Sequence, residues 1–99
     1  MKKDVKALIK RLTLLVQFKR LKKGWISIDG SGSVYICPAK PIFYPSGESE
    51  SLDYWDFKAS AFSLSDLGDL PLSMVCPSLT SKEALFYTDG ETVWLVETK

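Results

Sequence analysis

The sequence predicts an α+β protein in which an N-terminal amphipathic helix packs on a four- to five-stranded, mainly antiparallel sheet. Residues 3–22 predict the helix, because they contain no glycine or proline and are rich in helix-forming side chains. Residues 25–37 and 84–97 predict two β-hairpins, because each holds two alternating apolar runs around a glycine-containing turn.

The predicted helix has two apolar faces. At about 100° per residue, six side chains form a stripe that suits packing on a sheet: Val5, Leu8, Ile9, Leu12, Leu15 and Val16. A second group lies nearly opposite: Ala7, Leu14, Phe18 and Leu21. A helix on a small sheet buries only one stripe, so the second needs a cover, which is either the segment 38–80 or a partner. Asp4 is a candidate N-cap, and Gly24 follows the expected end of the helix.

The segments between and within the hairpins predict shorter elements. Ile42–Tyr44 suggests an edge strand stopped by a proline, and Tyr54–Lys58 suggests a further strand. We expect a helical turn over Ser63–Leu67 and a strand over Leu72–Cys76. The pair Asp89-Gly90 predicts a type I′ turn, which requires a positive φ at both central residues.

Charge is divided unevenly along the chain. Residues 1–24 hold nine basic residues and one acidic residue, a net charge of +8, whereas residues 25–99 hold four basic and eleven acidic residues, a net charge of −7. A chain of this length supports one core, so we interpret residues 1–99 as a single domain made of a basic helix and an acidic, β-rich body. The asymmetry suggests a charged partner, unless the helix lies against the acidic body of its own chain.

The chain contains no histidine, which removes the most common general base and a frequent zinc ligand. Cys37 and Cys76 are too few for a zinc site, and we expect two reduced, buried thiols in a cytoplasmic protein rather than a disulfide. The turn Asp29–Ser33 lacks the lysine of a phosphate-binding loop. We therefore expect no enzymatic activity, no metal and no cofactor. The longest apolar run of the helix, Leu14–Val16, is too short to span a membrane.

A pattern over residues 25–57 carries a resemblance. It consists of W-x-S-x-D-x-x-G-x-V-Y from Trp25 to Tyr35, then Lys40-Pro41, then Tyr54-Trp55. This pattern resembles small accessory proteins of tailed phages and prophages. It includes no catalytic residue. The resemblance implies a compact phage-encoded protein that binds and modulates a protein of its bacterial host, such as a nuclease, a polymerase or a defence factor.

We expect a non-enzymatic binding protein that docks on another protein. The predicted contacts are apolar anchors, basic side chains that steer association, and aromatic side chains beside the acidic segment 43–57: Leu14, Phe18 and Leu21; Lys10, Arg11 and Lys22; and Tyr44, Tyr54 and Trp55. The alternative is a non-specific nucleic-acid-binding protein that uses the basic helix to contact phosphates. A homodimer through the second apolar face also stays open.

Overall fold

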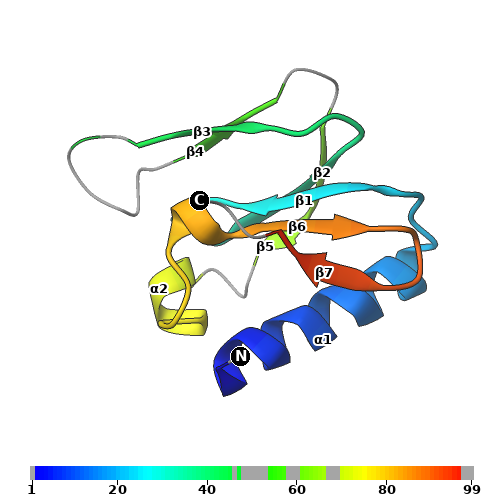
Figure 1. Ribbon diagram of the computed structural model, residues 1–99, viewed down its shortest axis with the longest axis horizontal. Helices are drawn as coiled ribbons and strands as arrows, with labels where there is room; N and C mark the ends of the chain where they lie inside the picture. The colour runs from blue at the N-terminus through cyan, green and yellow to red at the C-terminus, as the bar shows by residue number, and fades with distance from the viewer. Residues whose placement is uncertain (1, 46, 48–53, 58–60, 67–69, 97–99) are drawn as a thin grey trace.

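The computed structural model describes residues 2–45, 47, 54–57, 61–66 and 70–96, and it has the predicted α+β architecture. Three layers lie over one another in Figure 1: helix α1, a five-stranded sheet and a two-stranded ribbon. The elements follow in this order: α1 (Lys3–Lys19), β1 (Gly24–Ile28), β2 (Ser33–Cys37), β3 (Ile42–Tyr44), β4 (Tyr54–Asp56), β5 (Phe62–Asp66), α2 (Leu72–Val75), the 3-10 helix η2 (Ser81–Glu83), β6 (Leu85–Thr88) and β7 (Val93–Leu95).

The five-stranded sheet has the order β5-β2-β1-β6-β7, and all its neighbours are antiparallel. Its central strands β1, β2 and β6 bury alternating apolar side chains against α1. The helix contributes four buried side chains to this core: Val5, Leu8, Leu12 and Val16. All four belong to the stripe that the sequence predicts for sheet packing, so the helix is oriented as expected.

Helix α1 ends at Lys19, three residues earlier than predicted. Arg20 takes a left-handed conformation with φ of 52°, which breaks the helical repeat without a glycine. The N–H of Arg20 donates to the carbonyl of Gln17, and the N–H of Leu21 donates to the carbonyl of Val16. These two bonds form a Schellman motif, which satisfies the last carbonyls and turns the next apolar residue toward the core. Leu21 accordingly packs against the core.

The N-terminus of α1 is held by Asp4, although not as the predicted N-cap. The N-cap position is Lys2, whose side chain makes no capping bond. The carboxylate of Asp4 accepts hydrogen bonds from the N–H of Val5, at 3.0 Å, and from the N–H of Ser78, at 2.8 Å. The second bond ties the first turn of the helix to the segment after α2.

Both predicted hairpins are confirmed. The first, β1–β2, is closed by a turn in which the N–H of Gly32 donates to the carbonyl of Asp29. The second, β6–β7, does not use the predicted type I′ turn. Gly90 has φ of +102°, but among the described residues Arg20 alone has a positive φ without being glycine. Instead, the carboxylate of Asp89 accepts the N–H groups of Glu91 and Thr92, which stabilises a longer connection.

Two predicted elements are wrong, because the conformation of each segment depends on the part of the fold that it packs against. Ser63–Leu67 was expected as a helical turn, whereas residues 62–66 form β5, which pairs with β2. Phe62 and Leu64 alternate with serines, and the open edge of β2 accepts this pattern as a strand. Leu72–Cys76 was expected as a strand, whereas Leu72–Val75 forms α2. Leu72 and Cys76 are four residues apart, so one helical turn buries both.

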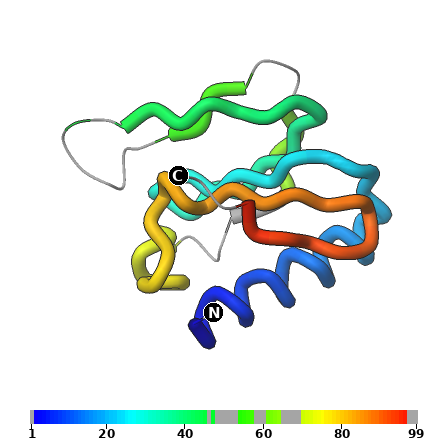
Figure 2. The backbone as a smooth tube through the Cα atoms, in the orientation of Figure 1, coloured from blue at the N-terminus to red at the C-terminus, as the bar shows by residue number. Residues whose placement is uncertain are grey.

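The ribbon β3–β4 covers the face of the sheet opposite to α1 (Figures 1 and 2). Ile42–Tyr44 is a strand as predicted, but it pairs with β4 rather than with the main sheet. The observed β4 is shorter than the predicted Tyr54–Lys58, and Lys58 lies outside the described residues. The ribbon is fastened to the β1–β2 turn because the N–H of Trp55 donates to the carboxylate of Asp29 at 3.1 Å.

Candidate functional site

The second apolar face of α1 is exposed along most of its length. Leu14 is 57% exposed and Phe18 is 86% exposed, and Ala7 is also exposed. The segment 38–80 does not cover these side chains in the described part of the chain. An exposed phenylalanine and an exposed leucine one turn apart form a small apolar surface of the kind that partners cover.

Basic side chains flank this surface. Lys10 and Arg11 are both exposed, and they lie on the helical turn before Leu14. Asp4 is the acidic residue in the first turn of α1, and its carboxylate is already bonded to the Ser78 N–H, which lowers its pKa. The outward side of the helix therefore presents positive charge beside apolar area. We call Lys10, Arg11, Leu14 and Phe18 the α1 face.

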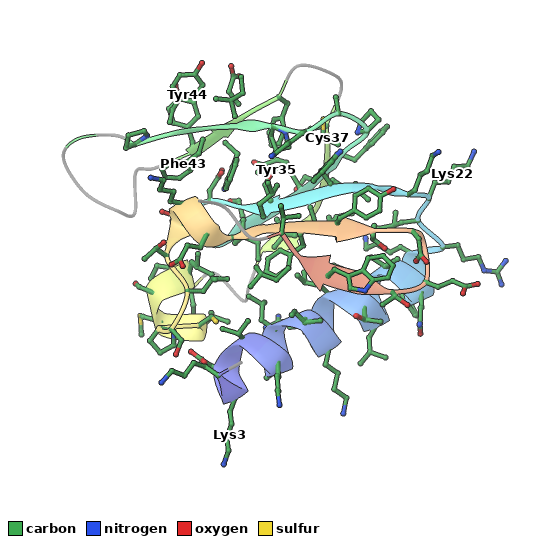
Figure 3. All side chains as sticks on the ribbon, viewed as in Figure 1. Lys3, Lys22, Tyr35, Cys37, Phe43 and Tyr44 are labelled. Atoms are coloured by element: carbon green, nitrogen blue, oxygen red, sulfur yellow. The ribbon has the colours of Figure 1, made fainter. Side chains whose placement is uncertain are left out.

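Leu21 does not belong to this surface, although the sequence placed it there. The Schellman turn at Arg20 carries Leu21 out of the helical repeat, and the side chain is half-buried against the core. Lys22 is exposed beyond the end of the helix. In Figure 3, Lys3 and Lys22 lie toward opposite ends of α1, so the basic residues of the first segment do not form one compact cluster.

The three aromatic residues predicted for binding have different environments. Tyr44 and Tyr54 pair across the ribbon, are exposed and stack with ring centroids 5.6 Å apart. Trp55 is only 5% exposed, and its ring packs edge-to-face on Phe43 at 5.1 Å. Trp55 is therefore part of the packing beneath the ribbon and is not on the surface. Figure 3 shows Tyr44 pointing away from the main sheet and Phe43 pointing toward it.

The predicted contacts thus fall on two separate surfaces. The α1 face lies on one side of the five-stranded sheet, and the tyrosine pair lies on the outer side of the ribbon, across the sheet from α1 (Figure 1). A single small partner surface does not reach both. The acidic residues between the tyrosines, Glu48, Glu50 and Asp53, are outside the described residues.

A row of aromatic rings that the sequence pattern alone does not predict crosses the ribbon side of the sheet. Trp25 contacts Tyr87 edge-to-face at 5.1 Å, and Tyr87 stacks with Trp94 at 6.2 Å. The ammonium of Lys40 lies 5.8 Å from the centre of the Trp25 ring. The alternation of the strands contains the signal for this row, because Trp25, Tyr87 and Trp94 are direct cross-strand neighbours once the register is known.

No family model, curated protein or solved structure matches this chain.

Chemically reactive groups are sparse in the described part of the chain. Cys37 and Cys76 are buried and form no disulfide. Burial, with the nearby charge of Asp4, raises the pKa of the Cys76 thiol to about 11, so the thiolate is scarce at neutral pH. Partial burial also raises the pKa of Asp29, although the N–H of Trp55 donates to its carboxylate. The described residues hold no cluster of three or more His, Cys, Asp or Glu side chains suited to a metal ion, and none of their helices has the length and apolar character needed to cross a membrane.

Proposed function

We propose that this protein is a non-enzymatic binding protein that docks on another protein through the α1 face. The observation that carries the proposal is the exposure of Phe18 and Leu14 on a helix whose opposite side is committed to the core. Large aromatic side chains at the centre of an interface supply much of its binding energy once water is excluded. Phe18 is the expected main anchor, and Leu14 is the second.

The partner surface that fits the α1 face is an apolar groove with acidic residues beside it. Lys10 and Arg11 are exposed, and exposed charges add more to the rate of association than to the final affinity. The excess charge of residues 1–24 acts in the same direction, because it attracts an acidic surface over distances up to about 10 Å at moderate salt. We expect the association rate to fall with added salt and the dissociation rate to change little.

The resemblance of residues 25–57 to phage accessory proteins supplies the biological setting of the proposal. In that setting the partner is a bacterial host protein, the complex forms in the host cytoplasm, and binding modulates the activity of the partner. The tyrosine pair on the ribbon, Tyr44 and Tyr54, offers a second contact for a partner that wraps around the domain.

Affinity capture from a nuclease-treated bacterial lysate tests this proposal. The double variant Leu14→Asp, Phe18→Asp places two charges on the α1 face and should lose the specific partner while the domain stays folded. Met74→Asp is a control for a charge placed elsewhere on the surface, because Met74 is also exposed but lies on α2. A partner retained equally by all three proteins would contradict the proposal, as would the absence of any specific partner.

Non-specific nucleic-acid binding is the second candidate function. It is supported by the exposed basic side chains of α1, such as Lys6, Lys10 and Arg11. Phosphate contacts predict a steep loss of affinity with salt and little dependence on sequence. Retardation of DNA or RNA at low salt that disappears in Lys10→Glu, Arg11→Glu, but survives the uncharged variant Leu14→Ser, Phe18→Ser, would favour this function over protein docking.

Self-association through the α1 face is a third outcome of the same experiments. Two copies of α1 packed antiparallel would cover Leu14 and Phe18 of both chains. Light scattering at two protein concentrations distinguishes this case, because a dimer would dissociate in the Leu14→Asp, Phe18→Asp variant.

A further inference from the structure

A cavity of about 380 Å³ lies at the C-terminal end of α1, between the segment that follows the helix and the neighbouring strands β2 and β5. Its apolar lining comes from Leu21, Ile36, Pro38 and Phe62. The volume is within the range of small-molecule pockets, roughly 300–1,000 Å³. It equals the space of about a dozen water molecules, which is enough for a short acyl chain or an aromatic ring with its substituents.

Phe62 is the lining residue whose apolar side chain the protein itself leaves largely exposed. Its side chain is 69% exposed on the outermost strand β5, opposite Ile36 in the register of the sheet. An apolar ligand seated against Leu21 and Ile36 would cover one side of this ring. The exposed phenylalanine therefore gives the cavity an apolar wall that loses contact with water only when a ligand fills the cavity.

The rim of the cavity is cationic. Arg20, Lys22 and Lys23 line it and are all exposed, and the described residues of its lining include no carboxylate. In the described part of the chain, no ion pair joins any of the three to an acidic residue. Capping of α1 does not require these charges, because the carbonyls of Val16 and Gln17 already accept backbone N–H groups. The charges are thus available to a ligand.

We propose that this cavity binds a small molecule with an apolar body and a carboxylate, such as a medium-chain fatty acid or an aromatic acid. The body would lie on Leu21 and Phe62, and the carboxylate would reach the rim formed by Arg20, Lys22 and Lys23. Charge complementarity and the apolar lining together select this class, because a neutral apolar molecule would leave the cations unused and a small hydrophilic anion would leave the apolar wall uncovered. This site is separate from the α1 face.

Titration with octanoate, followed by amide NMR spectra, tests the proposal. We expect saturable shifts centred on residues 20–23, 36 and 62. Octan-1-ol shares the body and acetate shares the head group, and both should bind at least about tenfold more weakly. Shortening the acid should weaken binding by about fourfold for each methylene removed from the cavity.

Three variants assign the binding to the cavity. Lys22→Glu, Lys23→Glu should weaken octanoate about tenfold or more, since it reverses the charge of the rim. Arg20→Gly removes one cation at a position where the left-handed backbone favours glycine, so the fold is kept while affinity falls. Lys10→Glu, Arg11→Glu is the control for the double variant, because it also reverses two positive charges but both residues lie outside the cavity, and it should bind octanoate normally.

Two results would overturn the proposal. One is the absence of saturable shifts up to roughly 10 mM octanoate in the folded wild type. The dissociation constant would then be too high for a specific complex. The other is unchanged octanoate binding in the Lys22→Glu, Lys23→Glu variant. Neither result bears on the protein-docking proposal, because none of the residues of the α1 face lines the cavity.

Discussion

Two leucines of α1 provide a controlled measurement of how the helix is oriented in solution. Leu12 is 1% exposed, and Leu14 is 57% exposed. Leu12→Ala and Leu14→Ala make the same chemical change two residues apart in the same helix, so their costs in helix propensity cancel in the comparison. The difference between their effects on the free energy of unfolding reports burial alone.

The expected magnitudes follow from that burial. Removing a buried leucine side chain costs about 2–5 kcal/mol, because the transfer energy is lost and a cavity remains. Complete burial of a leucine is worth about 1.5–3 kcal/mol, so a side chain that is less than half buried should cost below about 1 kcal/mol when truncated. With an m-value of roughly 1.5 kcal/mol/M, a loss of about 3 kcal/mol lowers the urea midpoint by about 2 M.

Urea unfolding followed by far-UV circular dichroism measures both variants. Phe18→Ala is a further check, because its ring is 86% exposed and alanine is the better helix former. It should be neutral or slightly stabilising despite the loss of a large side chain. Equal losses for Leu12→Ala and Leu14→Ala, or a loss above about 1.5 kcal/mol for Phe18→Ala, would refute the packing of α1 described here and remove the basis for the α1 face.

Three other predictions concern the body of the protein. Burial raises the pKa of Asp29, so the wild type loses stability as the pH rises from below the unfolded pKa through the raised folded pKa. Asp29→Asn does not ionise, and its amide oxygen still accepts the N–H of Trp55, so the variant should gain stability relative to the wild type between pH 3 and pH 7 in urea melts. The same pH profile for both proteins would contradict this prediction. Cys76 is buried and its pKa is raised to about 11, so it should resist iodoacetamide at pH 8 in the native protein and react in urea. Mass spectrometry measures the labelling, and rapid labelling of the native protein would be inconsistent with burial of this thiol. Gly90→Ala should lower the free energy of unfolding by about 1–3 kcal/mol, because alanine is strained at φ of +102° and its Cβ would lie 3.0 Å from the carbonyl oxygen of Leu21. A melting temperature equal to that of the wild type would show that the turn rearranges freely.

The hairpins were predictable because their determinants are local. Asp29 to Gly32 and Asp89 to Gly90 mark the two connections, and each connects apolar runs that pair with their nearest neighbour in the chain. The segment that begins at Phe62 has the same alternation of apolar and polar residues. It forms a strand only because β2 has a free edge, which no local sequence pattern reveals. The prediction for residues 63–67 therefore fails because the pairing partner, β2, is distant in sequence.

The candidate site shows the same division between local and distant determinants. Leu14 and Phe18 were found from helical periodicity, which needs only the sequence of α1. Trp55 was misplaced because its burial depends on the ribbon folding back over the sheet and bonding to Asp29. The aromatic row of Trp25 and Tyr87 was missed for an equivalent reason, since the two residues meet only when β1 pairs with β6.

The backbone at Arg20 determines how the apolar residues of the first segment are divided between two surfaces. Had the helix continued, Leu21 would have extended the exposed stripe beyond Phe18, as the helical repeat requires. The left-handed turn at Arg20 instead directs Leu21 inward, where it forms part of the cavity wall, and leaves Lys22 at the rim. The sequence offers no glycine at this point, so the turn is stabilised by the hydrogen bonds to Val16 and Gln17 and by the burial of Leu21. The left-handed turn at Arg20 therefore separates the α1 face, which we propose for protein docking, from the cavity, which we propose for a small acid, so different residues test the two proposals.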